Sequence, residues 1–485
     1  MTSLARPTTP PPRERRASSA DSPGRTKAKK ILRQSTNPSH MCHTAEALTI
    51  AVLGASGDLA KKKTYPSLLK LYLSGYLPSH CAIIGFARSD YSDESFRDKL
   101  RATLQNVGGE QGESKLEEFL LLCSYCRGKA YDDVDAWDAV HQRALASETN
   151  YDVANRVFYF AVPPNVFAAA GAAIKAKTMS SRGWNRMIIE KPFGRDSASS
   201  RALGEALSRS FTEDQLYRID HYLGKEVVQN FMVLRFGNIV LQPLWTRDYI
   251  QSVQITFKEN IGTMGRGGYF DNYGIIRDVM QNHLLQILSL VAMEPPVRVA
   301  GEGYANYVRD EKVKALRCIP PLKLGKTHGR VVEGVWGCAG GCRMSWVVVY
   351  WCCSMCFEVL FETGQLTLIS VVLCLCLDPV DDVVLGQYTG VGDEPGYLED
   401  PTVPKGSLCP TYCMAKFQIN NARWAGVPFI MKAGKGLNNR KCEIRIQFKP
   451  PPGSESMFGT SIPQNELVIR VQPDDAIYIK MNMKT

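Results

Sequence analysis

Residues 48–86 hold a strand, a glycine turn, a helix and a second strand in that order, and this order limits the fold more than any other feature of the sequence. The run 48–53 is short, apolar and rich in β-branched residues, and Gly54 follows it at once. A helical stretch, 65–74, and a second apolar run, 81–86, come next. Strand, helix and strand at this spacing predict a βαβ unit with buried parallel strands.

Two later runs continue the pattern. Residues 156–162 and 186–190 are again apolar, and they end at Pro163-Pro164 and Lys191-Pro192. Strands that end in such turns are typical of a doubly wound α/β sheet, whose ligand lies at the carboxyl ends of the strands. We therefore expect a Rossmann-like dinucleotide-binding domain over residues 47–220.

The pattern changes after about residue 220. The runs 253–257, 443–448 and 466–472 alternate or nearly alternate apolar and polar residues, as antiparallel strands with one covered face do. Residues 278–293 carry apolar side chains at helical spacing. Residues 221–485 are therefore predicted to form an α+β domain with a large, mainly antiparallel sheet.

The first 46 residues differ from the rest in charge. Residues 1–40 contain nine Lys or Arg and two acidic residues, so they carry +7 of the net charge of +10. Because this Pro-, Ser- and Arg-rich stretch has no apolar periodicity, residues 1–46 are expected to be disordered. They lack the interleaved aromatic residues of a nucleic-acid-binding face, so no nucleic-acid partner is expected. The composition matches a transit peptide, and an ordinary flexible terminus is the alternative.

The segment Gly54-Ala-Ser-Gly-Asp-Leu-Ala60 lies between the first strand and the first helix. Glycines there allow a pyrophosphate to approach the backbone, and the helix N-terminus supplies free N–H groups. The usual three-glycine spacing is not met, so an ordinary βα turn is the alternative. At the end of the second strand, Arg88 would suit the 2′-phosphate of NADP. Asp90 lies two residues further on and could bind the ribose hydroxyls of NAD, so NAD remains an alternative cofactor.

Residues 218–226, Arg-Ile-Asp-His-Tyr-Leu-Gly-Lys-Glu, are the most informative polar stretch. His221, Tyr222 and Lys225 offer donors that suit a phosphate dianion. A polar loop that enters a helix is the alternative. His283 is a second candidate, although a lone histidine in an apolar helix is commonly a satisfied core residue.

These segments resemble the glucose-6-phosphate dehydrogenase family. The matching stretches are 54–60, 190–196 (Glu-Lys-Pro-Phe-Gly-Arg-Asp), 218–226, 265–271 (Gly-Arg-Gly-Gly-Tyr-Phe-Asp) and 277–283 (Arg-Asp-Val-Met-Gln-Asn-His), in the family's order. The sequence at 404–408 and 422–424 is most similar to the plastid-type enzymes of plants and algae. The resemblance implies oxidation of C1 of D-glucose 6-phosphate to 6-phosphogluconolactone with hydride transfer to NADP, the first step of the oxidative pentose phosphate pathway.

The resemblance also implies a role for individual residues. His283 would be the general base, a task for which imidazole is suited near neutral pH, and Asp220 would orient it. The other residues would bind NADP (Gly54, Ala55, Ser56, Gly57, Asp58, Leu59, Ala60, Lys61, Arg88 and Lys191) or glucose 6-phosphate (Lys191, His221, Tyr222, Lys225, Glu259, Asp278, Lys435, Arg440 and Gln472). No metal is expected.

Residues 325–380 interrupt the resemblance. They include seven of the 15 cysteines of the chain. A membrane span is disfavoured because Glu358 and Glu362 divide the apolar sequence into pieces shorter than the ~20 residues that a span needs. The cysteine spacing does not match a zinc site. We interpret 325–380 as an atypical insertion, translated from retained non-coding sequence, and a genuine insertion is the alternative.

Two smaller departures concern the cofactor and the C-terminus. Phe167 stands where the family often has tyrosine, so one cofactor contact is expected to be absent. The family continues beyond Thr485 with a strand-rich segment that completes the large sheet and the subunit contact. We therefore expect a C-terminally truncated chain, which would form a homodimer or homotetramer if that segment were present.

The expected function is that of a glucose-6-phosphate dehydrogenase. A non-catalytic, truncated or misspliced product of the same family is the alternative. Plastid location is favoured over the cytoplasm, and no membrane association is expected.

Overall fold

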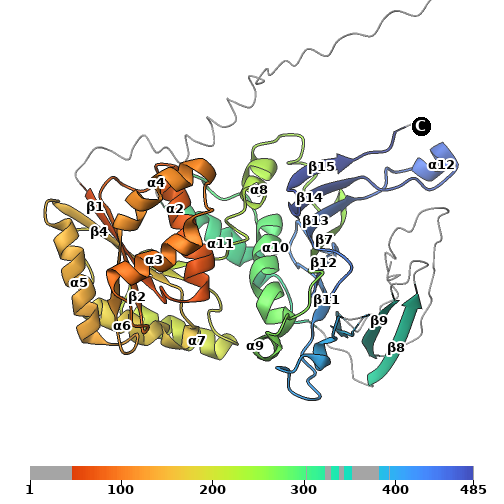
Figure 1. Ribbon diagram of the computed structural model, residues 1–485. Helices are drawn as coiled ribbons and strands as arrows, with labels where there is room; N and C mark the ends of the chain where they lie inside the picture. Colours follow the sequence, from red (N-terminus) through yellow and green to blue (C-terminus); the bar gives the residue numbers. More distant parts are fainter. Residues whose placement is uncertain are drawn as a thin grey trace, which may run out of the picture.

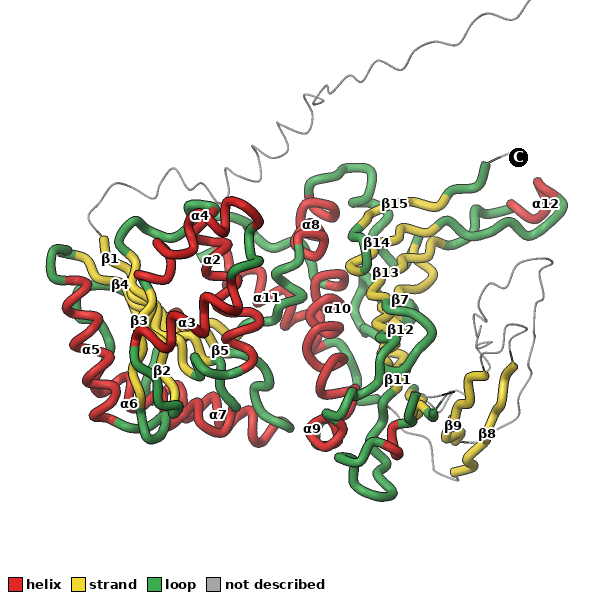
Figure 2. The backbone as a smooth tube through the Cα atoms, viewed as in Figure 1, coloured by secondary structure: helices red, strands yellow, loops and turns green. Residues whose placement is uncertain are grey.

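The computed structural model describes residues 46–301, 303–322, 382–390, 392 and 394–483, together with the backbone of 329–337 and 343–351. The chain forms two sheets, one in each half, with helices around the first and between the two (Figures 1 and 2). Apart from Glu46, the basic tail lies outside the described residues, as does most of the segment 325–380.

The N-terminal sheet has six parallel strands in the order β3-β2-β1-β4-β5-β6. Their bounds are Glu46–Leu53 (β1), Cys81–Ala87 (β2), Cys123–Arg127 (β3), Val153–Phe160 (β4), Asn185–Ile189 (β5) and Leu216–Arg218 (β6). The chain thus starts in the middle of the sheet, builds one edge and then returns to build the other. This is the Rossmann order, and it confirms the predicted fold of this half.

Strand β1 illustrates why these strands are apolar throughout. Ile50 and Val52 belong to the core on one face of the sheet, and Ala51 and Leu53 to the core on the other. The first face is covered by α2 (Tyr65–Leu73), α3 (Asp93–Leu104) and α4 (Gly109–Leu121), and the second by α5 (Val134–Glu148), α6 (Phe167–Lys177) and α7 (Ser197–Ser208). Because both faces are removed from water, almost every position of the strand is apolar.

The second sheet has nine strands in the order β15-β14-β13-β7-β12-β11-β10-β9-β8. Their bounds are Ile250–Lys258 (β7), Gly329–Gly337 (β8), Arg343–Trp351 (β9), Val383–Tyr388 (β10), Tyr412–Phe417 (β11), Phe429–Gly434 (β12), Lys441–Phe448 (β13), Glu466–Gln472 (β14) and Ala476–Lys480 (β15). All neighbours are antiparallel except β7 and β12, which run parallel. The mainly antiparallel sheet is as predicted.

Helices cover the face of this sheet that is turned toward the N-terminal half (Figure 1). They are α8 (Glu226–Phe236), α9 (Gly267–Asp271), α10 (Leu285–Ala292) and α11 (Tyr304–Arg317), and a short helix, α12 (Ser454–Phe458), lies near the far end of the sheet. Phe231 of α8 and Leu288 of α10 are buried in one cluster with Ile255 and Ile444 of the central strands. Packing against these helices therefore supplies the covered face that the alternating pattern predicted.

The predicted helix 278–293 is not uniform. Residues Ile276–Leu284 form a π-helix that runs directly into α10. Asp278 and His283 are five residues apart, which is one hydrogen-bonded turn of a π-helix but overshoots a turn of an α-helix. The π-helix therefore brings these two side chains toward the same side, which apolar spacing alone did not reveal.

Strands β8 and β9 arise from within the segment 325–380. They pair with each other, and β9 pairs with β10, so they continue the sheet at its edge. The bounds and origin of the insertion stay predictions, because the rest of this segment lies outside the described residues. None of the described helices is both long and apolar enough to cross a membrane.

Candidate active site

The centre of the candidate site is a hydrogen-bonded pair formed by Asp220 and His283. Asp220 follows β6, and His283 lies on the π-helix of the second half of the chain. Nδ1 of His283 is 2.8 and 2.9 Å from the two carboxylate oxygens of Asp220, and both residues are shielded from water, with His283 only 3% exposed. The sequence placed these residues 63 positions apart, and the fold brings them into contact.

The charge state of Asp220 fixes which ring nitrogen carries a proton. Burial raises the pKa of Asp220, but hydrogen bonds from His283 and from the backbone N–H of Tyr222 outweigh this effect and leave its pKa lower than usual. An ionised carboxylate only accepts hydrogen bonds, so Nδ1 of His283 donates to it. The imidazole therefore has Nε2 as its acceptor, which can take a proton from a hydroxyl group.

Two rings enclose the imidazole of His283. The ring of His221 lies 4.4 Å from it in an edge-on arrangement, and the ring of Tyr222 lies 4.5 Å from it. Desolvation is the largest cause that lowers the pKa of His221 to about 4, and the electrostatic effects of His283, Lys191 and Lys225 act in the same direction. His221 is therefore neutral at neutral pH and can bind a phosphate only as a neutral donor.

Lys225 also lies next to Tyr222. Its Nζ is 5.2 Å from the centroid of the Tyr222 ring. The residue occupies the N-cap of α8 but makes no side-chain capping bond there. Its ammonium is thus available for an anion next to His221 and Tyr222.

Lys191 connects the two halves of the chain. Its Nζ donates to the carbonyl oxygen and to Oδ1 of Asp278, both at 2.9 Å. The Lys191–Pro192 peptide bond that follows β5 is cis. A cation that follows a strand of the parallel sheet thus pairs with a carboxylate of the π-helix that also carries His283.

The remaining predicted residues come from one end of the nine-stranded sheet. Glu259 directly follows β7 and forms an ion pair with Lys435, which directly follows β12. Because β13 runs antiparallel to β7 and β14, the start of β13 lies beside the ends of β7 and β14. Arg440, just before β13, and Gln472, which pairs with Cys442 at the end of β14, therefore lie at this same end of the sheet. Arg440 is also close enough to Tyr222 to affect its pKa electrostatically.

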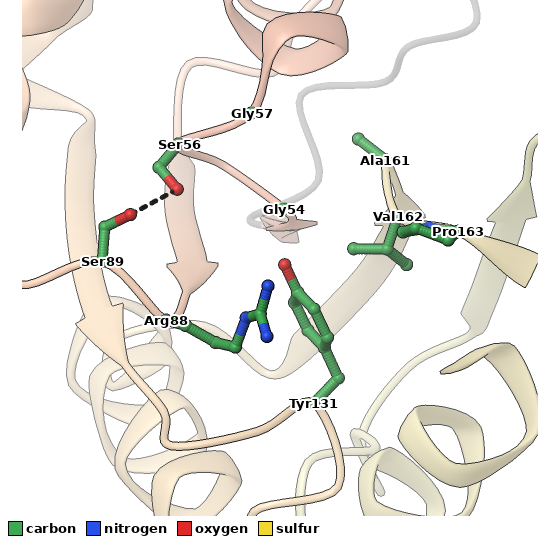
Figure 3. A pocket seen from close by; sticks show the side chains of 9 residues that line it. All are labelled: Gly54, Ser56, Gly57, Arg88, Ser89, Tyr131, Ala161, Val162 and Pro163. Atoms are coloured by element: carbon green, nitrogen blue, oxygen red, sulfur yellow. Dashed lines mark hydrogen bonds between the residues drawn. The ribbon is translucent and has the colours of Figure 1, made fainter. Parts of the chain in front are cut away.

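The glycine turn borders a separate pocket of about 520 Å³ at the carboxyl ends of β1, β2 and β4 (Figure 3). It is lined by Gly54, Ser56, Gly57, Arg88, Ser89, Tyr131, Ala161, Val162 and Pro163. Gly54 has φ +76°, and a Cβ there would lie 2.4 Å from the carbonyl oxygen of Ala161. Only glycine fits this turn, which holds β1 and β4 close together beside the pocket.

Arg88 points into this pocket toward Tyr131, whose ring centroid is 5.9 Å from the guanidinium carbon (Figure 3). Asp90, the residue that made NAD an alternative cofactor, forms an ion pair of 2.8 Å with Arg127 of β3. After the end of β2, the guanidinium of Arg88 therefore borders the pocket, whereas the carboxylate of Asp90 is paired with Arg127.

Only some of the turn residues predicted to bind the cofactor line the pocket. Gly54, Ser56 and Gly57 line the pocket, whereas Ala55 and Ala60 are fully buried in the core and Asp58 is paired with Lys62. Leu59 and Lys61 are not among the lining residues. The side chain of Phe167 is likewise buried in the core, against Phe160.

Sequence reasoning missed Ser89, Tyr131, Ala161 and Val162. Ser89 follows Arg88 and donates to Ser56 at 2.9 Å, and Ala161 and Val162 precede the Pro163 that marked the end of a strand. These three carried a positional signal. Tyr131 carried none, because it follows the third strand in a loop without a motif. Within the described ranges, no group of three or more His, Cys, Asp or Glu is arranged to hold a metal ion.

Family models match both halves of the chain. The model described as glucose-6-phosphate dehydrogenase, NAD binding domain, matches residues 51–230, and the C-terminal domain model of the same family matches 232–349 and 366–485. The chain belongs to the glucose-6-phosphate dehydrogenase family. The models leave 350–365 unmatched, a stretch shorter than the segment 325–380 that the sequence set apart.

Relatives in this glucose-6-phosphate dehydrogenase family include plastid and other forms. The chain is 46% identical to glucose-6-phosphate 1-dehydrogenase of Dictyostelium discoideum, over 90% of this chain and 76% of that protein. It is 45% identical to the chloroplastic glucose-6-phosphate 1-dehydrogenase 3 of Arabidopsis thaliana, over 90% of this chain and 64% of that protein.

Solved structures of glucose-6-phosphate dehydrogenases share the fold. One, described as the enzyme in complex with its substrate glucose-6-phosphate, superposes with a TM-score of 0.75 at 42% identity and covers 92% of this chain and 79% of that one. The enzyme from Mycobacterium avium superposes with a TM-score of 0.69 at 29% identity, over 90% of this chain and 81% of that one.

Proposed function

We propose that this chain oxidises C1 of D-glucose 6-phosphate to 6-phosphogluconolactone and transfers the hydride to NADP. One observation carries the proposal: the Asp220–His283 pair is enclosed and hydrogen-bonded, and its neighbour His221 is under the electrostatic influence of both Lys191 and Lys225. In the family to which the chain belongs, a solved relative is described in complex with glucose 6-phosphate.

The chemistry follows from the protonation states. Nε2 of His283 would take the proton of the C1 hydroxyl, and ionised Asp220 would stabilise the imidazolium that results. Bound NADP would accept the hydride that C1 releases. Because the imidazole is held by Asp220 and by two flanking rings, its position is set before the substrate arrives, which lowers the entropic cost of reaching the transition state.

The substrate would be held by groups on both sides of His283. Lys225, Tyr222 and neutral His221 would bind the phosphate, and Lys191 would reach both sugar and nicotinamide. The carboxylates of Asp278 and Glu259 would bind sugar hydroxyls, with Lys435, Arg440 and Gln472 at the same end of the sheet. Asp278 and Glu259 are already paired with lysines, so hydroxyls would join ion pairs whose charges are balanced.

We infer NADP rather than NAD from the pocket at the glycine turn. The lining residues fit a dinucleotide, because backbone approaches the pocket closely at Gly54 and Arg88 stands at the end of β2. A guanidinium suits the 2′-phosphate of NADP. NAD would need a free carboxylate for its ribose hydroxyls, and the nearby Asp90 is engaged by Arg127.

Arg88→Ala should raise the KM for NADP by about 10-fold or more, because a charge-assisted hydrogen bond contributes ~1.5–3 kcal/mol. The KM for NAD should change little. Steady-state rates with each cofactor measure this, and Arg88→Lys, which keeps the charge but loses the planar fork, should lie in between. An unchanged preference for NADP over NAD would remove Arg88 from the cofactor site.

The function itself is tested by mixing the purified chain with glucose 6-phosphate and NADP and following NADPH absorbance. Turnover that requires the phosphorylated sugar supports the proposal. Binding of both compounds without turnover would instead support the alternative of a non-catalytic family member.

Assembly and location are further proposals. The composition of residues 1–46 and the chloroplastic relatives support a plastid protein, although relatives from Dictyostelium, Drosophila and yeast are also similar. A homodimer or homotetramer is proposed by analogy with the family.

A further inference from the structure

Two loops at one end of the nine-stranded sheet carry the Glu259–Lys435 ion pair. They are the β7 loop (259–266) and the β12 loop (435–440), and they leave the sheet side by side because β7 and β12 are parallel neighbours. The N–H of Glu259 donates to the carbonyl oxygen of Gly434 at 2.9 Å, and two further backbone hydrogen bonds join the loops directly. The ion pair therefore spans two loops whose backbones are tied together.

The ring of Tyr388 lies directly against both loops. Tyr388 is the last residue of β10 and is only 7% exposed. A Cβ at Gly262 of the β7 loop would lie 2.6 Å from the hydroxyl oxygen of Tyr388, and a Cβ at Gly436 of the β12 loop would lie 2.7 Å from its Cγ. Side chains at these two positions would displace the ring, so the two glycines allow one tyrosine to pack on the backbone of both loops.

The hydroxyl of Tyr388 is hydrogen-bonded to the β7 loop. It accepts from the backbone N–H of Thr263 at 2.9 Å and lies 3.1 Å from Oγ1 of Thr263, which is 2.7 Å from Oδ2 of Asp400. Hydrogen bonds, first of all from the side chain of Thr402, lower the pKa of Asp400 to about 2, so its carboxylate is ionised and only accepts. The hydroxyl of Thr263 therefore donates to Asp400, and the hydroxyl of Tyr388 donates to Thr263.

The backbone of Tyr388 is connected to the β12 loop through Thr411. The N–H of Tyr388 donates to Oγ1 of Thr411 at 2.9 Å, and the N–H of Lys435 donates to the carbonyl oxygen of Thr411 at 3.0 Å. Thr411 is fully buried. Tyr388 thus contacts both loops with its ring, bonds one with its hydroxyl and reaches the other through a single buried residue.

We propose that Tyr388 is a positioning residue that holds the Glu259–Lys435 pair in place for the sugar. Its ring and hydroxyl fix the spacing of the β7 and β12 loops, and thereby the positions of the carboxylate and the ammonium. Tyr388 acts through these loops and takes no part in the proton or hydride transfer. This inference rests on the proposed function, in which Glu259 and Lys435 bind the substrate, but part of its test needs no substrate.

Tyr388→Phe tests this role, because it removes the hydroxyl and keeps the ring. The buried N–H of Thr263 then loses its acceptor, and the β7 loop is held less firmly. The Kd of glucose 6-phosphate, measured by calorimetry, should rise by about 3- to 10-fold, the usual effect of one lost hydrogen bond. The KM for NADP should hardly change, because the pocket at the glycine turn lies in the other half of the chain.

Two further variants separate positioning from general stability. Thr263→Val removes the hydroxyl that links Tyr388 to Asp400 and should raise the Kd by a similar factor. Tyr397→Phe is the matched control: Tyr397 is fully buried, and its ring lies 5.9 Å from that of Tyr388. Its hydroxyl donates to Asp271 of α9 at 2.8 Å instead of to either loop. Tyr397→Phe should therefore keep the parental Kd, whatever it loses in Tm.

Hydrogen exchange tests the same role without substrate. The backbone amides of the β7 and β12 loops should exchange faster in Tyr388→Phe than in the parent chain, because local opening of the two loops becomes easier. In Tyr397→Phe the exchange of these amides should match that of the parent.

A Tyr388→Phe variant with the parental Kd for glucose 6-phosphate and parental exchange in both loops would overturn the proposal. An equal rise of the Kd in Tyr397→Phe would also overturn it, because the effect would then be a general loosening of the buried aromatic residues. If the parent chain neither binds nor oxidises glucose 6-phosphate, the proposed function fails instead, and hydrogen exchange alone decides whether Tyr388 holds the pair.

Discussion

Replacing His283 with asparagine should lower kcat with glucose 6-phosphate by about 10²–10⁴-fold, the usual contribution of a general base. The amide cannot accept the C1 hydroxyl proton at neutral pH. Because the ring is enclosed by Asp220, His221 and Tyr222, its loss should leave the Kd of both substrates nearly unchanged. Single-turnover NADPH formation and calorimetric binding measure the two quantities separately.

His80→Asn is the matched control, since His80 is an exposed histidine at the opposite end of the parallel sheet, in contact with Tyr151. It should retain parental kcat. Asp220→Asn should also lower kcat strongly, because an amide no longer selects the tautomer with Nδ1 protonated. A His283→Asn variant within about tenfold of parental kcat would rule out His283 as the base.

Lys225→Ala should raise the KM for glucose 6-phosphate by about 10- to 100-fold, corresponding to ~1.5–3 kcal/mol for a charge-assisted hydrogen bond to the phosphate. Since His221 is neutral at this pH, Lys225 carries much of the charge that would face the phosphate. The fold should tolerate the change, because the side chain of Lys225 makes no capping bond to α8. The KM for NADP should hardly change.

The substrate itself provides the control for Lys225. Glucose without the phosphate should be oxidised with the same kcat/KM by the parent and by Lys225→Ala, because the lysine would then have no anion to bind. A variant that loses activity equally toward glucose and glucose 6-phosphate would show that Lys225 acts on something other than the phosphate.

Much of the fold could be predicted because its signals are local. Short apolar runs that end at Gly54, Pro163 or Pro192 indicate strands with both faces covered. A few neighbouring residues are enough to show this pattern. The alternation at 466–472 reports one covered face in the same way, and β14 spans Glu466–Gln472. The π-helix escaped prediction because an extra residue in one turn barely alters the apolar spacing of a longer helical stretch.

In the candidate site, too, only the features with a local signal in the sequence could be predicted. Motif-bearing residues such as Asp220 and His283 could be named from the sequence through the family resemblance. The engagement of Asp90 by Arg127, which bears on the choice of cofactor, could not be predicted, because the partner lies on a neighbouring strand. Tyr131 was missed because it lies in a loop without a motif.

The sequence by itself thus determined the order of strands and helices, the glycine turn and the kinds of side chain available for chemistry. These follow from periodicity and residue type, which act over a few positions of the chain. The resemblance implied that Asp220 orients His283, and the structure places the two side chains in contact. Only the tertiary structure decided that Lys191 meets Asp278 and that Arg127 engages Asp90. Such contacts depend on how two sheets and the helices between them pack, and packing joins residues whose separation along the chain carries no local signal.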